Sequence, residues 1–388
     1  MEDGRTRDAA GIRAAKSRIA VELQGRYDAL LQSKRVQWTT YHYFERELGR
    51  GGQGIVYLSV RKGADGFTQP VAMKVFSPDR FATAEMYAAA MERIARVASR
   101  IAMIQHDNLL SVQDFVDQNR IRIMVMEWVD GIDLRQLVNP DRLDLIQKLT
   151  EPERWAYIER VIATRGPEQT RFKAGVAVAV VRDCLAALAA LHRHGIVHGD
   201  IKPANIMLKK TGAAKLIDMG SAFEMDHPPA TRACTPAYAA PEVLEGAHST
   251  PQSDLASVGY VLIEMLAGRS CFPSEADYQE LLEAKRSLPA RLAEVLPPDV
   301  SCNDHLMNFC RRLIAPDPTK RFPSAEAAEL LQGGAAEFHR QLVFGHLASE
   351  YTNDIRVLLE EVFRIEALAV PDSSESGSSS SWTLPPTV

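Results

Sequence analysis

Apolar positions change their spacing along the chain. Between about residues 41 and 128 they form short, partly alternating runs that are rich in β-branched and aromatic residues and separated by glycine-containing turns. One longer run has apolar residues at helical spacing and predicts a helix over 83–104. The short runs predict strands over 44–49, 55–60, 71–76, 110–116 and 121–128. The first part of the chain is therefore expected to be a small sheet with one main helix.

Beyond Gly131 the pattern is mainly helical. A buried helix is predicted over 172–194, and it ends at Gly195, a residue type that commonly terminates helices. Further helices are predicted over 253–267, 276–286, 304–314 and 324–331. Residues 139–173 are relatively charged, and we interpret them as an insert that forms an extra helical patch. A sheet-rich first part and a helical second part predict an α+β fold with two lobes.

Both ends of the chain carry amphipathic stretches. Residues 1–40 predict a helical extension, because apolar residues recur at helical spacing at Ile12, Ala15, Ile19, Leu23, Tyr27 and Leu30. A second apolar stripe, from Phe338 to Phe363, predicts an amphipathic helix within 334–370. Such a stripe needs a partner surface. We expect that surface to be the chain's own large lobe, with the N-terminal helix or a second protomer as alternatives. Residues 371–388 are Ser-rich and predict a disordered tail.

Composition narrows the class of protein. The 388 residues exceed the usual size of a single core, and 46% apolar with 24% charged residues is ordinary for a soluble protein. The net charge of −5 gives no case for nucleic acid or membrane binding. Five scattered cysteines without a C-x-x-C pair favour reduced thiols. The apolar stretch Ala174–Val181 is far shorter than the ~20 residues of a membrane span. We therefore expect a cytoplasmic protein.

Candidate chemistry is concentrated in His198-Gly199-Asp200-Ile201-Lys202-Pro203-Ala204-Asn205, followed by Asp218-Met219-Gly220. Asp200 can accept a proton from an attacking hydroxyl, and Lys202 can neutralise charge on a transferring phosphoryl group. Asn205 and Asp218 offer hard oxygen ligands for magnesium. A single H-x-D is often only a surface turn, but the further groups at fixed offsets argue against chance. Few reactions need this set of side chains in one place.

A glycine-rich stretch lies between the first two predicted strands. Gly49, Gly51 and Gly54 lack Cβ atoms, so the backbone there can close over phosphate groups. The same spacing also suits an ordinary hairpin, but no helix follows directly, which argues against a dinucleotide site. Lys74 follows in the apolar strand 71–76, where an inward-facing ammonium needs an anionic partner.

The order and spacing of these motifs resemble the signature of the eukaryotic-like (Hanks-type) serine/threonine protein kinases over residues 41–331. The motif sequences look similar to those of bacterial members. The resemblance implies a two-lobed protein-kinase fold over 41–333. The small antiparallel-sheet lobe with one main helix would cover 41–128, and the large helical lobe 129–333. It also implies ATP and Mg²⁺ as cofactors and a protein substrate with a serine or threonine acceptor. A homodimer or a regulatory partner through the terminal helices stays open.

The resemblance assigns roles to individual residues. Lys74, Asp200 and Lys202 would be catalytic, together with a helix glutamate, and Asn205 and Asp218 would bind the metal. Met126 would be the gatekeeper of the adenine pocket and Asp133 a ribose-binding carboxylate. The nucleotide-binding residues that it implies are Gly49, Gly51, Gly54, Val56, Ala72, Lys74, Met126, Glu127, Val129, Asp133 and Met207. In the large lobe, Glu242 would pair with Arg321, and Asp254 would brace the catalytic loop.

The helix glutamate departs from the pattern. Counting forward from Lys74 places Glu92 at a typical interval, and we take Glu92 as the catalytic helix glutamate that pairs with Lys74. Counting back from His106 reaches Val97 instead, and Glu85 is the other acidic candidate. A displaced or absent ion pair stays an alternative. This departure keeps a pseudokinase or scaffold that binds nucleotide and a partner as an alternative function. A small-molecule phosphotransferase is a further alternative.

A second departure concerns regulation. Gly199 replaces the arginine that usually precedes the catalytic aspartate in the family, so a phosphate on Thr231 or Thr235 would lack its usual cationic anchor. Arg232 and Lys215 are candidate substitutes. We expect activity that depends little on phosphorylation of this segment.

Overall fold

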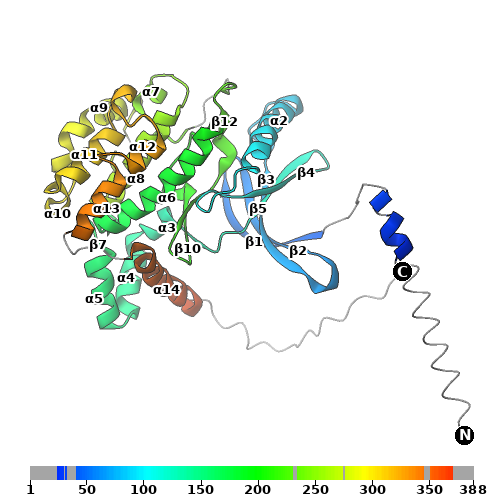
Figure 1. The fold of residues 1–388 in the computed structure, drawn as a ribbon, viewed down its shortest axis with the longest axis horizontal. Coiled ribbons are helices and arrows are strands. Elements are labelled where there is room, and N and C mark those ends of the chain that lie inside the picture. The colour runs from blue at the N-terminus through cyan, green and yellow to red at the C-terminus, as the bar shows by residue number, and fades with distance from the viewer. Residues whose placement is uncertain are drawn as a thin grey trace, which may run out of the picture. The chain divides into compact units, whose positions relative to one another are not determined.

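The structure is a computed structural model that describes residues 24–29, 31–32, 41–229, 234–273, 276–344 and 350–369 (Figure 1). The chain divides into two compact units, residues 1–45 with 59–70 and residues 46–58 with 71–388. In the predicted N-terminal extension, 24–29 and 31–32 are helical, whereas Ile12, Ala15, Ile19, Leu23 and Leu30 lie outside the described residues. The predicted tail 371–388 also lies outside them.

A five-stranded sheet forms most of the first part of the chain. Its strand order is β1-β2-β3-β5-β4, and both β3 and β4 pair antiparallel with β5. The strands are β1 (Tyr41–Gly51), β2 (Gly54–Lys62), β3 (Thr68–Phe76), β4 (Val112–Gln118) and β5 (Ile121–Glu127). Helix α2 (Ala84–Ile101) begins at Thr83, whose side chain accepts a hydrogen bond from the Met86 amide. This helix buries Met91, Ile94 and Val97 on one face.

Two long helices form the centre of the large lobe. Helix α6 (Ala174–Arg193) packs against α8 (Pro251–Ala267), and Figure 1 shows both in the middle of the helical part. Their surroundings include α9 (Tyr278–Val295), α11 (Asp304–Leu313) and α12 (Ala325–Leu330). Among the described residues α6 is long and apolar enough to cross a membrane, but most of it is buried. We therefore interpret it as the core helix of this lobe.

The expected insert has its own secondary structure. Helices α4 (Pro140–Leu149) and α5 (Pro152–Val161) are followed by a hairpin of β7 (Ala163–Arg165) and β8 (Thr170–Phe172). Both helices have proline at their start, where the missing N–H costs nothing.

The segment predicted as one C-terminal helix is described as two helices, α13 (Ala335–Phe344) and α14 (Tyr351–Ala369). Helix α13 packs on α6, α11 and α12, whereas α14 packs on α4, α5 and α6. The stripe residues Phe338, Ile355 and Leu359 are buried in these contacts. The expected partner surface, the chain's own large lobe, is therefore the one observed.

Short strands position the candidate catalytic segment. Strand β10 (Ile206–Lys209) pairs antiparallel with β11 (Ala214–Leu216) and with β6 (Gly131–Asp133), and β9 (Ile196–Val197) pairs with β12 (Phe223–Glu224). Asp200 and Asn205 lie between β9 and β10, and Asp218 follows β11. The pairing of β10 with β11 and of β9 with β12 brings the two parts of the predicted motif together, because one strand of each pair adjoins each part.

Candidate active site

Asp254 holds the backbone of the two residues that precede Asp200. Its carboxylate is buried and accepts hydrogen bonds from the amides of His198 at 3.0 Å and Gly199 at 2.9 Å. His192 Nε2 lies 2.9 Å from the same carboxylate. Gly199 has φ +74°, a left-handed conformation that glycine adopts without a Cβ penalty. Asp254 therefore occupies the bracing position predicted for it.

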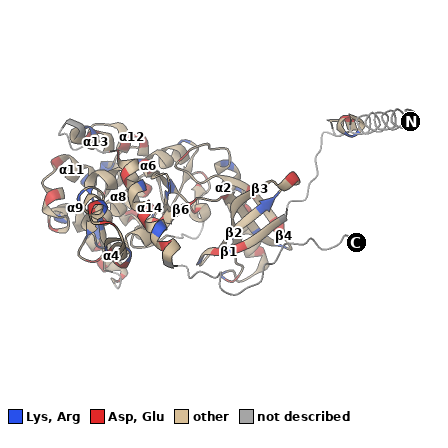
Figure 2. Ribbon diagram, turned by 90° about the horizontal axis from the view of Figure 1, so that it is seen from below, with Lys and Arg blue, Asp and Glu red and all other residues tan. Residues whose placement is uncertain are grey.

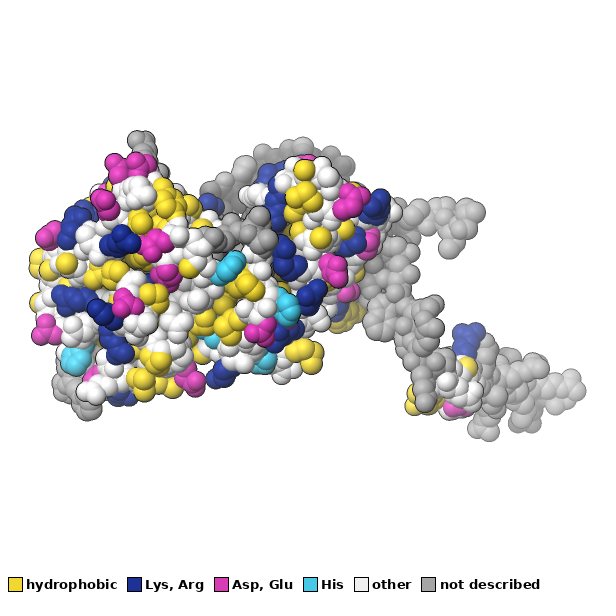
Figure 3. Space-filling view, turned by 90° about the horizontal axis from the view of Figure 1, so that it is seen from above, with side chains coloured by type: hydrophobic (Ala, Val, Ile, Leu, Met, Phe, Trp, Pro, Cys, Tyr) yellow, Lys and Arg dark blue, Asp and Glu magenta, His cyan; other side chains and the backbone are white. Residues whose placement is uncertain are grey.

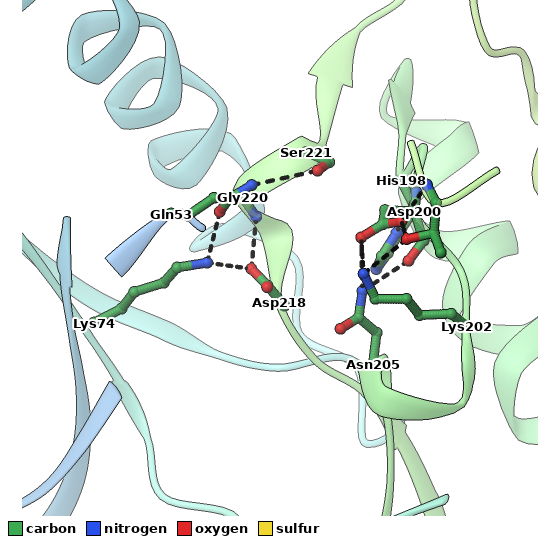
Figure 4. Close-up of polar contacts among 10 residues, drawn as sticks. Gln53, Lys74, His198, Asp200, Lys202, Asn205, Asp218, Gly220 and Ser221 are labelled. Atoms are coloured by element: carbon green, nitrogen blue, oxygen red, sulfur yellow. Dashed lines mark hydrogen bonds and ion pairs between the residues drawn. The ribbon is translucent and has the colours of Figure 1, made fainter. Parts of the chain in front are cut away.

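The carboxylate of Asp200 is surrounded by polar groups from its own loop and from Thr235. Lys202 Nζ lies 2.7 Å from Asp200 Oδ2 and 2.9 Å from Thr235 Oγ1. The Thr235 hydroxyl donates to Asp200 Oδ1 at 2.7 Å. The Asn205 side-chain amide donates to the Asp200 carbonyl at 2.7 Å (Figure 4). These contacts fix both carboxylate oxygens in orientation.

Lys74 forms an ion pair with Asp218. Its ammonium lies 2.5 Å from Asp218 Oδ1, and only 7% of the lysine side chain is exposed. Burial opposes ionisation of Asp218, but the charge and hydrogen bond of Lys74 outweigh it and hold the pKa of Asp218 below its ordinary value. Asp218 itself has φ +60°, an uncommon conformation for a residue with a side chain. The Gly220 amide donates to the same carboxylate at 3.0 Å.

Gln53, in the glycine-rich loop, also contacts Lys74. The ammonium donates to Gln53 Oε1 at 2.7 Å, and Gln53 Nε2 donates to Ser221 Oγ at 3.4 Å (Figure 4). A Cβ atom on Gly220 would lie 1.9 Å from Gln53 Oε1, so glycine at this position is what admits the amide. No role was predicted for Gln53 from the sequence.

The prediction that Glu92 pairs with Lys74 is wrong. The Glu92 side chain is 79% exposed, and its nearest cationic partner is Arg96 at 4.0 Å, one turn along α2. Glu85, the other acidic candidate, is an exposed residue in the first turn of the same helix. Val97, reached by the backward count, is buried. The apolar face of α2 points inward, so both acids fall on its outer side.

Asn205 and Asp218 are suited to a small divalent cation. Within the described residues, hydrogen bonds engage the Asn205 side-chain nitrogen and Asp218 Oδ1. Asn205 Oδ1 and Asp218 Oδ2 accept no hydrogen bond from the part of the chain that the structure describes, so they can act as ligands. Mg²⁺ prefers such hard oxygens, and it usually takes only one or two protein carboxylates together with water and phosphate oxygens. The donor chemistry of the predicted metal pair fits this cation.

The predicted nucleotide-binding residues lie on paired strands. Ala72 on β3 is opposite Met126 on β5, and Met207 on β10 is opposite Asp133 on β6. The Asp133 carboxylate accepts from the Gln136 amide at 2.9 Å and so caps α3 (Leu134–Leu137). Of the remaining predicted residues, Gly49 and Gly51 lie on β1, Gly54 and Val56 on β2, Glu127 at the end of β5, and Val129 two residues beyond it.

Gly54 has a specific steric role. Its φ is +140°, and a Cβ atom there would lie 2.0 Å from the Val75 carbonyl oxygen of β3. The amide of Ser77, just after β3, donates to the Gln53 carbonyl at 3.0 Å. The glycine-rich loop is therefore held close to the strand that carries Lys74.

A cavity of about 300 Å³ opens beside the catalytic loop. Arg80 and Arg93 line it together with Gly199 and Ser249. Burial, with a contribution from Arg93, lowers the pKa of Arg80. Lys215, a candidate substitute for the missing arginine, is buried and pairs instead with Glu127 at 2.6 Å. The other candidate, Arg232, lies outside the described residues, as does Thr231.

Two buried cations support the segment that follows Thr235. Arg321 forms the predicted ion pair with Glu242, the second residue of α7 (Pro241–Leu244). Lys285, on α9, donates to the Ala237 carbonyl at 2.6 Å, and its ammonium lies 4.0 Å from the ring centroids of both Tyr260 and Phe272. Lys285 was not anticipated from the sequence, although it lies four positions after Leu281 and three before Leu288, on the buried face of α9.

Comparisons with known proteins agree with this geometry. The family model described as the protein kinase domain matches residues 42–332. The serine/threonine-protein kinase PkaA of Streptomyces coelicolor is 31% identical over 300 residues, which cover 74% of this chain and 48% of PkaA. PkaB of the same organism is 30% identical over 297 residues, covering 74% and 61%. PknB of Mycolicibacterium smegmatis is 28% identical over 346 residues, covering 85% and 46%.

This chain thus spans between 46% and 61% of the length of these three relatives. The two-lobed fold expected from the sequence is confirmed by the family match and by the antiparallel sheet followed by a helical lobe. The chain therefore belongs to the protein kinase family, as a eukaryotic-like (Hanks-type) member similar to serine/threonine kinases of bacteria.

Proposed function

We propose that this protein is an ATP- and Mg²⁺-dependent serine/threonine protein kinase that transfers the γ-phosphate to protein hydroxyls, its own included. The observation that carries the proposal is the pair of clusters in Figure 4. In one, Asp200 is oriented by Lys202, Asn205 and Thr235. In the other, Lys74 pairs with Asp218. A base and a charge-neutralising lysine stand beside a second lysine and two metal-ligating oxygens, as phosphoryl transfer requires.

In this proposal Asp200 Oδ2 or Oδ1 accepts the proton of the attacking hydroxyl. Lys202 lies 2.7 Å from Asp200, so its ammonium is next to the oxygen that attacks and can stabilise charge that develops on the phosphoryl group. Lys74 orients the phosphates that precede the transferred one. Asn205 and Asp218 would hold Mg²⁺, which supplies positive charge to the phosphate oxygens when it is bound.

Partners and location are proposed on less direct support. The kinase relatives are named for serine and threonine, so the acceptor is proposed to be a protein hydroxyl. Charged side chains of both signs are interspersed over the large lobe in the views of Figures 2 and 3, which gives no reason to propose nucleic acid as a partner. A cytoplasmic location, and a dimer or regulatory partner through the terminal helices, stay predictions.

The test is transfer of labelled phosphate from Mg²⁺-ATP to a generic protein substrate. We expect transfer by the unaltered protein, and loss by at least about a hundredfold in Asp218→Asn and in Lys74→Met, since each removes an electrostatic catalytic group. Both variants should keep the circular dichroism spectrum and the unfolding transition of a folded protein. Nucleotide binding without transfer in the unaltered protein would contradict the proposal and would indicate a scaffold. Near-normal turnover of either variant at saturating ATP and Mg²⁺ would refute the site assignment.

A further inference from the structure

We propose that Gln53 is the positioning residue for Lys74, in the place that a carboxylate on α2 would otherwise fill. This inference rests on the proposed kinase function. Its starting point is that α2 contains only two acids, Glu85 and Glu92, and both are on the exposed side of the helix. A buried ammonium needs more than one acceptor, because an unmet N–H is costly away from water.

The acceptors that Lys74 does have are Asp218 and Gln53, at 2.5 Å and 2.7 Å. Asp218 is also one of the two proposed metal ligands, so its charge must be shared with a cation when nucleotide is bound. Gln53 carries no charge and no metal role. It is therefore the acceptor that can stay with Lys74 while Asp218 turns to the metal.

The position of Gln53 is itself fixed from three sides. Its carbonyl accepts from the Ser77 amide, which ties the loop to the end of β3. Its side-chain nitrogen donates to Ser221 Oγ, just after the Asp218-Met219-Gly220 segment. Gly220 leaves the space that the amide oxygen occupies, since a Cβ there would lie 1.9 Å from it. An amide held at both ends sets one direction for the lysine that donates to it.

The cavity beside Gln53 supports its role as the positioning residue for Lys74. Gln53, Ile94 of α2, Gly220 and Ser221 line one cavity of about 300 Å³. Gln53 thus borders the cavity that α2 also lines, and its amide reaches the ammonium from the loop.

The experiment compares Gln53→Met, which keeps length but removes the acceptor, with Gln53→Glu, which keeps the acceptor. Gln118→Met, on an exposed position of β4, is the matched control. We expect Gln53→Met to raise KM for ATP and Kd for ADP by about tenfold or more, the range for a hydrogen bond to a charged group, with a smaller change in kcat. Binding of adenosine, which has no phosphates, should not change. Gln53→Glu should stay within about threefold of the unaltered protein.

A double-mutant cycle gives a second readout. Gly220→Ala places a methyl group 1.9 Å from Gln53 Oε1 and 2.9 Å from Lys74 Nζ. It should therefore weaken ADP binding when Gln53 is present, and do so less in a Gln53→Ala background, where only the contact with Lys74 is left. Equal effects in both backgrounds would overturn the inference, as would ADP binding by Gln53→Met that is unchanged or tighter than normal. If the unaltered protein binds ADP but transfers no phosphate, the proposed function fails, while the ADP measurements still decide the role of Gln53.

Discussion

Arg321 and Glu242, 79 positions apart in the chain, form a bidentate ion pair in which both N–O distances are 2.7 Å. The arginine side chain is fully buried, and its Nε and Nη1 also donate to the carbonyls of Ala315 at 2.8 Å and Gln252 at 2.9 Å. Glu242 is the second residue of α7, shortly after the segment that contains Thr235. The pair therefore links α7, which follows the Thr235 segment, to the loop before Arg321 and to the start of α8.

Removing one member of this pair should be strongly destabilising. In Arg321→Met the Glu242 carboxylate loses its partner in a buried setting, for which the expected loss is about 3–5 kcal/mol in the free energy of unfolding. Urea denaturation followed by circular dichroism measures it. Arg311→Met, an exposed arginine on α11, is the control and should cost no more than about 0.5 kcal/mol. A loss below about 1 kcal/mol in Arg321→Met would show that the pair does not hold this region.

Lys285 gives a pH dependence with a definite sign. Burial lowers the pKa of Lys285 from its ordinary value to about 7. Because its pKa in the unfolded chain is the ordinary, higher one, the unfolded state binds more protons between the two values, and stability must rise with pH in that window. Relative to Lys285→Met, the unaltered protein should therefore gain stability from about pH 7 to pH 9, by at most about 1.4 kcal/mol per pH unit.

Urea denaturation of both proteins across this pH range is the measurement. The rings of Tyr260 and Phe272 favour the charged form of Lys285 and so act against the effect of burial. Their effect would move the lower end of the pH window, in which stability rises, to higher pH. A difference in stability that is flat up to pH 10 would show that the rings and the Ala237 carbonyl fully offset the burial.

Shortening the chain after Gln332 should lower its stability. The cut removes α13 and α14, which bury Phe338, Ile355 and Leu359 against the lobe, and it exposes the apolar surface of α6 that they cover. The apparent melting temperature should fall by several degrees or more, and the shortened protein should associate through the exposed surface. Shortening after Val370 is the control for the predicted tail. Thermal scanning and size-exclusion chromatography test both, and an unchanged melting temperature after the first cut would contradict the packing argument.

Activity is expected to depend little on phosphorylation of the segment around Thr231 and Thr235. Gly199 offers no guanidinium beside Asp200, and Thr235 already bridges Asp200 and Lys202, so a phosphate on Thr235 would lie against the Asp200 carboxylate. Turnover of phosphatase-treated protein and of Thr231→Ala should stay within about threefold of untreated protein. A hundredfold drop in both would indicate a phosphate-dependent switch, with Arg80 and Arg93 as the cations beside Gly199.

The catalytic segment could be predicted because its information is local. Asp200, Lys202 and Asn205 lie within six consecutive residues, so their spacing can be taken directly from the sequence. The short strands β9 and β10 on either side were not predicted. Glu92 could not be assigned in the same way. A helix turns by about 100° per residue, so an error of one or two positions moves a carboxylate from the inner to the outer face. The structure alone fixes that register.

Other features escaped prediction for different physical reasons. Gln53 meets Lys74 across 21 positions and Ser221 across 168, and no residue pattern in a glycine-rich loop indicates which way an amide points. Helix α9 was expected to end at Arg286, yet it continues through Pro289 to Val295. Tertiary packing of Leu288 and Leu292 against the core outweighs the hydrogen bond that proline removes.

The contact between α14 and the insert makes each segment a support for the other. Arg154 of α5 meets Glu360 and Glu361 at 2.6 Å each, Thr150 donates to Glu361 at 3.0 Å, and Tyr157 donates to Asp354 at 2.5 Å. The residues of one segment find their partners in the other, although some 200 positions separate them. Asp354 and Glu361 are buried on α14. Deleting the insert while keeping α14 would therefore leave two buried carboxylates without these partners, so an engineered kinase should lose or receive both segments together.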